Sequence, residues 1–165
     1  NCILTGIITD TGNLLYESTS DKTIQIASEM ITRGARFPKI IDSTWRNKSL
    51  GAMKIWGEAM KGLVINEKYN IAYSILTREM VENKGASEEE LEGLSGFLNN
   101  LYGIKALLLL REDDNNRIKG SLRTADPNVD VSALAKYFGG GGHIRASGFS
   151  LDGQLVKTES GWKIL

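Results

Sequence analysis

The apolar residues of the first 62 positions recur mainly at helical spacing. Ser20 is a good N-terminal cap, and Pro38 suits the first turn of a helix. Together with the apolar periodicity, these signals predict three helices, over about 21–34, 38–47 and 49–61. The short apolar run at 2–8 ends at a polar turn, and its pattern fits a helix end and a strand equally well.

From residue 63 onward the pattern is typical of alternating strands and helices. Ser87 to Glu90 matches a capping box, which indicates a solvated helix start rather than a metal site. A polar turn at 113–116 separates two of the apolar segments. The order is strand, helix, strand, strand, helix, strand, over about 69–76, 87–101, 104–110, 117–124, 130–137 and 146–151. This order predicts an α/β fold with a small mixed sheet, 146–151 as its last strand, and no clear structure for 152–165.

Composition limits the function classes. The chain has 165 residues, and its 20 basic and 20 acidic residues cancel, which argues against a broad grip on long duplex nucleic acid. Cys2 is the sole cysteine, so no internal disulfide can form, which fits a cytoplasmic protein. No apolar run is long enough to span a membrane, so no membrane partner is expected.

Residues 139–143 read Gly-Gly-Gly-Gly-His and contain the only histidine. Such a run is entropically costly, and it is often kept where backbone N–H groups approach a phosphate. A histidine beside it adds a donor, or a charge near neutral pH. The alternative is a flexible turn next to an exposed histidine.

The predicted strand 117–124 places Lys119, Ser121 and Arg123 on one face and Leu122 on the other. Arginine binds phosphate or carboxylate with two parallel hydrogen bonds. The row is therefore a candidate anion site, especially if the glycine run lies beside it. The alternative is a solvated strand face whose charges protect a sheet edge.

The C-terminal half contains four motifs in succession: Ser121-Leu122-Arg123, the segment 129–135, the Phe-Gly-Gly-Gly-Gly-His run at 138–143, and Ala146-Ser147-Gly148-Phe149. Together they resemble the DHH-associated C-terminal domain of the DHH-family phosphoesterases, and the resemblance extends over about residues 3–151. Upstream, 5–12 is similar to the last metal-binding motif of the DHH catalytic domain. The branch that the chain most resembles is the bacterial nanoRNase and pAp phosphatase group.

The resemblance implies a hydrolase that uses two manganese ions to cleave short oligonucleotides and 3′-phosphoadenosine 5′-phosphate. Asp10 matches a metal-ligating aspartate, and hard oxygen ligands suit manganese. The positions that match the substrate-binding part are Ser121, Arg123, Gly140, Gly141, Gly142 and His143, with Arg145 as an extra cation beside the loop. Substrates would be short oligonucleotides or nucleoside phosphates.

The sequence also departs from that family. It has no Asp-His-His motif and lacks the other ligands of two metal sites, so we expect the C-terminal part of a longer enzyme, inactive by itself. Residues 1–34 are then the remnant of the catalytic domain, 35–62 a helical connector, and 63–165 the DHH-associated domain. The apolar connector would support a homodimer.

Two other functions stay open from sequence. DHH-associated domains also serve as nucleic-acid-binding modules without hydrolase activity, as in alanyl-tRNA synthetases. The second alternative is a soluble domain in which the glycines form only a loop.

Overall fold

The structure, a computed structural model, describes residues 1–16, 19–113, 115–159 and 161–165. Its internal contacts divide the chain into two units, Asn1–Lys48 and Ser49–Leu165. This division lies inside the predicted connector 35–62, because the second predicted helix belongs to the first unit and the third to the second unit. In the part of the chain that the structure describes, no helix is both long and apolar enough to cross a membrane.

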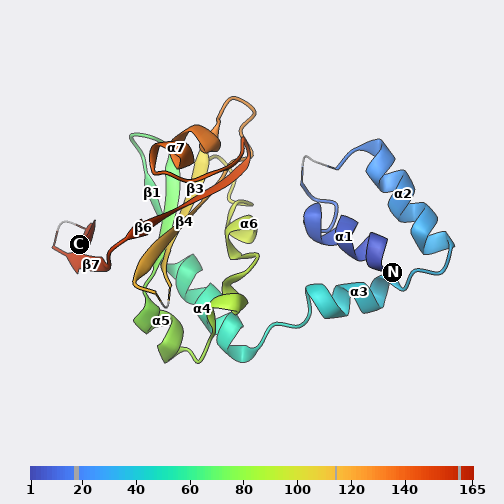
Figure 1. The fold of residues 1–165 in the computed structure, drawn as a ribbon, viewed down its shortest axis with the longest axis horizontal. Coiled ribbons are helices and arrows are strands. Elements are labelled where there is room, and N and C mark those ends of the chain that lie inside the picture. The colour runs from blue at the N-terminus through green and yellow to red at the C-terminus, as the bar shows by residue number, and fades with distance from the viewer. Residues whose placement is uncertain (17–18, 114, 160) are drawn as a thin grey trace. The chain divides into compact units, whose positions relative to one another are not determined.

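The first unit contains three helices, drawn in blue and cyan in Figure 1. Residues 2–8, whose pattern fitted a helix end and a strand equally well, form part of a helix. The predicted cap at Ser20 is confirmed: its Oγ accepts from the backbone N–H of Thr23, and the Thr23 side chain accepts from the Ser20 N–H in return. The helices are α1 (Cys2–Asp10), α2 (Asp21–Thr32) and α3 (Phe37–Thr44), and their buried core is Leu4, Ile8, Ala27 and Ile40.

The second unit is built on a six-stranded mixed sheet in the order β1-β2-β3-β4-β6-β5, which confirms the predicted α/β class. β2 and β3 are parallel, and the other neighbours are antiparallel. The strands are β1 (Val64–Asn66), β2 (Ile71–Leu76), β3 (Ala106–Glu112), β4 (Arg117–Arg123), β5 (Gly141–His143) and β6 (Ala146–Asp152). A separate hairpin follows, β7 (Leu155–Thr158) with β8 (Gly161–Ile164).

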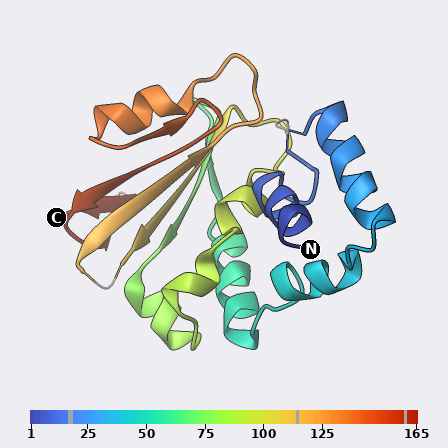
Figure 2. The ribbon, with the colours of Figure 1, turned by 45° about the vertical axis from the view of Figure 1, so that its right-hand side comes forward.

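Helices cover both faces of this sheet (Figure 2). One face packs on α4 (Leu50–Lys61), α5 (Arg78–Asn83), the 3₁₀ turn η1 (Glu88–Leu91) and α6 (Leu94–Leu98); its core includes Ile55, Leu94 and Leu107. We call this the α4–α6 face. The opposite face packs on α7 (Val131–Tyr137) and on the β7–β8 hairpin, with Leu122 and Ile118 buried under them.

Several sequence predictions are wrong in detail. The glycine run is not a loop, because residues 141–143 pair with β6 as an edge strand. β4 is not at an edge, since it lies between β3 and β6. The helix predicted over 87–101 is interrupted at Gly93, whose φ of 85° leaves the helical region. The strand at 146–151 is not the last, because residues 155–158 pair with residues 161–164 as the hairpin. The strand β1 and the helix α5 were not predicted. Within the predicted turn 113–116, Asp114 lies outside the described residues.

Candidate phosphate-binding site

The sheet register brings the predicted binding residues onto the α4–α6 face. Arg123 of β4 pairs with Ala146 of β6, which pairs with His143 of β5. Paired residues of neighbouring strands point to the same face, so Arg123 and His143 flank Ala146 at two strand spacings, about 10 Å. On the same face Leu107 pairs with Arg123, and Leu107 is buried against the α4–α6 helices, which fixes which face this is.

A second row lies next to the first. Ser121 pairs with Gly148, and Gly148 pairs with Gly141, all on the α4–α6 face because they are two residues from the first row. Together the two rows form a floor of small residues bordered by a guanidinium, a hydroxyl and an imidazole. We call this surface the binding floor; its residues are Ser121, Arg123, Gly141, His143, Ala146 and Gly148.

Arg145 lies at the end of this floor. Residues 144 and 145 form the turn between β5 and β6, and the carbonyl of Arg145 accepts from the N–H of Thr124, directly after Arg123. Arg123 itself donates from Nη1 to the carbonyl of Leu122 at 2.9 Å, which orients its guanidinium. Three of the predicted binding residues, Arg123, His143 and Arg145, therefore lie at one end of the sheet.

The four glycines of the run have different roles. Gly139, with φ 75°, and Gly140 donate their N–H groups to Lys136 and Ala135, which closes the end of α7 as a Schellman motif. A Cβ on Gly140 would overlap the carbonyl of Gly148, and Gly142 has a φ of 136° and a Cβ position 2.7 Å from the Ala146 carbonyl. A Cβ on Gly141 would meet no atom within 4 Å. Of these four glycines, Gly141 alone has neither a positive φ nor a nearby atom of the described fold that would exclude a Cβ.

Lys119, the third member of the predicted row, is held by carboxylates. Its Nζ lies 2.5 Å from Oε1 of Glu88 on η1 and 3.4 Å from Oδ2 of Asp113. Glu88 hydrogen-bonds this ammonium group and raises the pKa of Lys119; burial opposes the shift, and Asp113 adds to it. Arg111, which pairs with Lys119 across the sheet, lies 3.9 Å from the same Glu88 oxygen. The charges of two cations and two carboxylates therefore balance at the Lys119 end of the β4 row.

Asp113 is the most buried of these carboxylates, with 3% of its side chain exposed. Burial raises its pKa. The backbone N–H groups of Asn115 and Arg117 and the ammonium group of Lys119 lower the pKa by more than burial raises it, so the net shift is downward. The group is therefore ionised near neutral pH. It stabilises the β3–β4 turn, because one carboxylate oxygen accepts from two backbone N–H groups.

Asp10, the predicted metal ligand, is the exposed last residue of α1. Three consecutive residues just after it, Gly12, Asn13 and Leu14, have φ values of 54°, 62° and 65°. Thr11 supports this turn: its hydroxyl donates to the Ile7 carbonyl and accepts from the Leu14 N–H. Among the described residues, no group of three or more histidine, cysteine or acidic side chains is close enough to hold a metal. Asp10 is therefore not part of such a group within the described residues.

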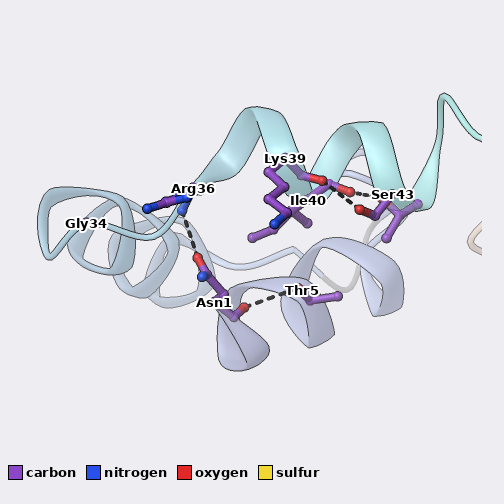
Figure 3. A pocket seen from close by; sticks show the side chains of 8 residues that line it. Asn1, Thr5, Gly34, Arg36, Lys39, Ile40 and Ser43 are labelled. Atoms are coloured by element: carbon purple, nitrogen blue, oxygen red, sulfur yellow. Dashed lines mark hydrogen bonds between the residues drawn. The ribbon is translucent and has the colours of Figure 1, made fainter.

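The first unit also contains a cavity of about 480 Å³ between α1 and α3 (Figure 3). Asn1 closes one side, and its side-chain oxygen accepts from the backbone N–H of Arg36. The hydroxyls of Ser43 and Thr44 donate to carbonyls of their own helix, and Arg36 and Lys39 add two cationic side chains to the wall. None of the predicted binding residues is among those that line it, which are Asn1, Thr5, Gly34, Arg36, Lys39, Ile40, Ser43 and Thr44.

Comparison with known proteins decides the family. The DHHA1 domain matches residues 68–159, which is more than half of the chain. The chain belongs to the DHHA1 family. This DHHA1 protein is 30% identical over 150 residues to the bifunctional oligoribonuclease and PAP phosphatase NrnA of Bacillus subtilis, covering 90% of the chain and 46% of that protein. It is 26% identical to NrnA of Thermus thermophilus, with 92% and 44% covered.

A solved structure supports the same fold for this DHHA1 protein. An exopolyphosphatase-related protein from Bacteroides fragilis matches with a TM-score of 0.82 and 29% identity, over 93% of this chain and 45% of that one. The resemblance to the nanoRNase and pAp phosphatase branch of the DHH family is thereby confirmed. The DHHA1 chain spans a little less than half the length of these relatives.

Sequence reasoning missed two features of this region, the small side chains of β6 and the ion pairs of Lys119. Ala146, Gly148 and Ser150 alternate with larger residues, and this period of two is a signal that one face of β6 carries only small side chains. No sequence signal indicated that carboxylates balance the charge of Lys119. Glu88 is 31 residues away in the chain, and its predicted role was only that of a solvated cap.

Proposed function

We propose that the binding floor holds the phosphate and the adjoining sugar and base of a short oligonucleotide or nucleoside phosphate, as the substrate-binding part of a DHH phosphoesterase. The observation that carries this proposal is the register that unites Arg123, Ser121, Gly141 and His143 on one sheet face. A guanidinium binds phosphate through two hydrogen bonds, and an open glycine floor admits a ligand close to the backbone.

The proposed substrates follow those named for the relatives, oligoribonucleotides and 3′-phosphoadenosine 5′-phosphate. The floor has few side chains that could read base edges, which suits substrates chosen by length and terminal phosphate rather than by sequence. The zero net charge of the chain offers little attraction for long duplexes.

We also propose that the longer enzyme uses two manganese ions and that Asp10 supplies one carboxylate ligand. Such ions activate a water and stabilise the leaving oxygen of a phosphoryl transfer. The residues of this chain then bind and orient: Arg123 and His143 place the phosphate-bearing end, and Ser121 contributes a hydroxyl donor. The lone cysteine suits a reducing cytoplasm, which we propose as the location. The homodimer stays a prediction that sedimentation analysis would test.

The proposal is tested by nucleotide binding to the whole 165-residue chain. Arg123→Ala is expected to weaken AMP binding about tenfold, because a charged hydrogen bond to phosphate is lost. Arg33→Ala is the matched control, since Arg33 makes only a surface ion pair with Glu29 on α2. Calorimetry gives the affinities. Equal AMP affinity in the wild type and Arg123→Ala would refute the assigned role.

A further inference from the structure

The loop between α6 and β3, residues 99–105, carries an exposed aromatic ring. The loop begins after Leu98 and ends at β3, and both Leu98 and Ile104 pack into the core of the α4–α6 face. It therefore lies on the same side of the sheet as the binding floor. Between these two anchors Tyr102 is 99% exposed, the largest fraction among the exposed large apolar residues that the structure describes.

The same loop lies next to the Arg123 end of the floor. The carbonyl of Lys105 accepts from Thr124 Oγ at 2.6 Å, and Thr124 directly follows Arg123. Tyr102 is three positions before Lys105, so their Cα atoms are at most about 11 Å apart. Leu107 pairs with Arg123, so the loop borders the β3 side of the row that contains Arg123.

Hydrogen bonds to the neighbouring strand fix the backbone of this loop. Asn70 Nδ2 donates to the Gly103 carbonyl at 2.8 Å, and the N–H of Lys105 donates to the Asn70 carbonyl at 2.8 Å. Gly103 has a φ of 83°, which lets the chain turn directly after Tyr102. A tyrosine ring has two χ angles, so a ring on a fixed backbone loses little conformational entropy when a flat ligand stacks on it.

We propose that Tyr102 is a stacking platform for the base of the nucleotide next to the one on the binding floor. This inference rests on the proposed function of the floor. The ligand class is a single-stranded oligonucleotide of at least two nucleotides, whereas a lone nucleotide occupies the floor without touching Tyr102. Every base has a π-face, so stacking adds affinity without reading the sequence.

Stacking, rather than charge, is the expected source of this affinity. Asp126 lies beside Thr124, because its N–H donates to the Thr124 hydroxyl at 3.0 Å. A carboxylate near the loop opposes the attraction of a second phosphate. The gain from Tyr102 should therefore depend little on salt, unlike the contribution of a cation that binds a phosphate.

The test compares AMP with the dinucleotide 5′-phosphoadenylyl-(3′→5′)-adenosine, pApA, on the metal-free whole chain. Because pApA contains two AMP units, one base stays available for Tyr102 whichever unit lies on the floor. In the wild type we expect pApA to bind at least about fivefold tighter than AMP. Tyr102→Ala should weaken pApA about five- to tenfold, the scale of one base stacked on an aromatic ring, and leave AMP within about twofold of the wild type.

Two further variants make the test specific. Tyr102→Phe keeps the ring and should keep the affinity for pApA. Tyr137→Ala is the matched control, because Tyr137 is 82% exposed but ends α7, which covers the opposite face of the sheet. Calorimetry at about 50 and 200 mM salt gives the affinities, and the ratio between wild type and Tyr102→Ala for pApA should be similar at both. Circular dichroism confirms that each variant is folded.

The outcomes separate the two proposals. The inference is overturned if Tyr102→Ala binds pApA like the wild type, if it weakens AMP as much as pApA, or if Tyr137→Ala has the same effect on pApA. A loss of pApA affinity in Tyr102→Phe equal to that in Tyr102→Ala would also overturn it. If Arg123→Ala weakens neither AMP nor pApA, the proposed function of the floor is overturned instead, whatever Tyr102 contributes.

Discussion

Among the four consecutive glycines, three have a structural reason to lack a side chain. Gly139 and Gly142 have φ values of 75° and 136°, and Gly140 lies against the backbone of β6. Gly141 pairs with Gly148, has open space where a Cβ would be, and lies on the face that carries Ser121 and Arg123. The fold therefore does not require a glycine at position 141, whereas a side chain there would project from the binding floor.

Alanine substitutions at neighbouring glycines test this distinction. Gly141→Ala is expected to change the free energy of unfolding by no more than about 0.5–1 kcal/mol, since the added methyl meets no atom. It should weaken AMP binding at least about fivefold, because the methyl projects from the binding floor. Gly140→Ala should destabilise the fold by about 3 kcal/mol or more, since its Cβ would overlap the Gly148 carbonyl.

Urea unfolding and calorimetry measure the two quantities on the same samples. A Gly141→Ala protein that binds AMP like the wild type would contradict the place of Gly141 on the binding floor. A Gly140→Ala protein as stable as the wild type would contradict the close approach of this glycine to β6.

Residue types and their spacing made most of the binding floor predictable. Period-two alternation placed Ser121 and Arg123 on one face of a strand, and the structure confirms that face. The sequence did not predict that residues 141–143 form an edge strand, because glycines have no side-chain pattern to read and low strand propensity. Only the pairing with β6 reveals which glycine lies on the same face as Ser121 and Arg123.

At the scale of elements, the β3–β4 turn depends on a buried charge. Asp113 accepts from the backbone N–H groups of Asn115 and Arg117 and lies 3.4 Å from Lys119. Its pKa is lowered in the folded state, so the unfolded chain binds its proton more readily. The stabilisation is therefore fully present above the unfolded pKa of about 3.9, and is lost as pH falls through the lower folded pKa.

Asp113→Asn should be less stable than the wild type at pH 7, and the difference should narrow as the pH falls below about 4. The reason is that the wild type then protonates Asp113 and loses the same interactions. Asp152→Asn is the control, because Asp152 pairs with Arg117 while 94% of its side chain is exposed, and such pairs contribute little. Urea unfolding across pH 2.5–7 measures the difference, and parallel curves for Asp113→Asn and the wild type would contradict the prediction.

The β7–β8 hairpin is one of the elements that sequence periodicity missed. Its strands have four residues each, too few for a clear alternation. Tertiary contacts hold it: Leu155 packs on Ile75 and Ile118, and its N–H donates to Glu112 Oε1 at 2.6 Å. The other oxygen of Glu112 accepts from the N–H of Arg78, so one carboxylate joins the hairpin to α5.

Leu155→Ala should lower the free energy of unfolding by about 2–3 kcal/mol, because it leaves a cavity over Ile75 and Ile118. Trp162 should become more exposed, since it packs in the same cluster. Val156→Ala is the control, because Val156 is not part of that cluster. Tryptophan fluorescence during denaturation measures both effects, and equal stability of the two variants would contradict a hairpin held by Leu155.

At the scale of the whole molecule, the two units differ in what they contribute to the proposed reaction. Ser49–Leu165 contains the binding floor, whereas Asn1–Lys48 contains Asp10 as the candidate metal ligand. The four fully or nearly buried core side chains of the first unit form a small core, and the chain covers 46% of the Bacillus subtilis relative. The described chain therefore contains the whole binding floor but only one candidate metal ligand, Asp10.

This imbalance predicts binding without turnover. With manganese present, the 165-residue chain should bind AMP but release no product from a dinucleotide or from adenosine 3′,5′-bisphosphate above background. One carboxylate cannot hold two ions, and the described residues include no cluster of three metal-ligating side chains. Asp10→Asn should leave AMP affinity unchanged, because Asp10 lies outside the binding floor. Chromatography of the reaction products, with Bacillus subtilis NrnA as the positive control, measures turnover; robust hydrolysis by this chain would mean that it holds a complete catalytic centre.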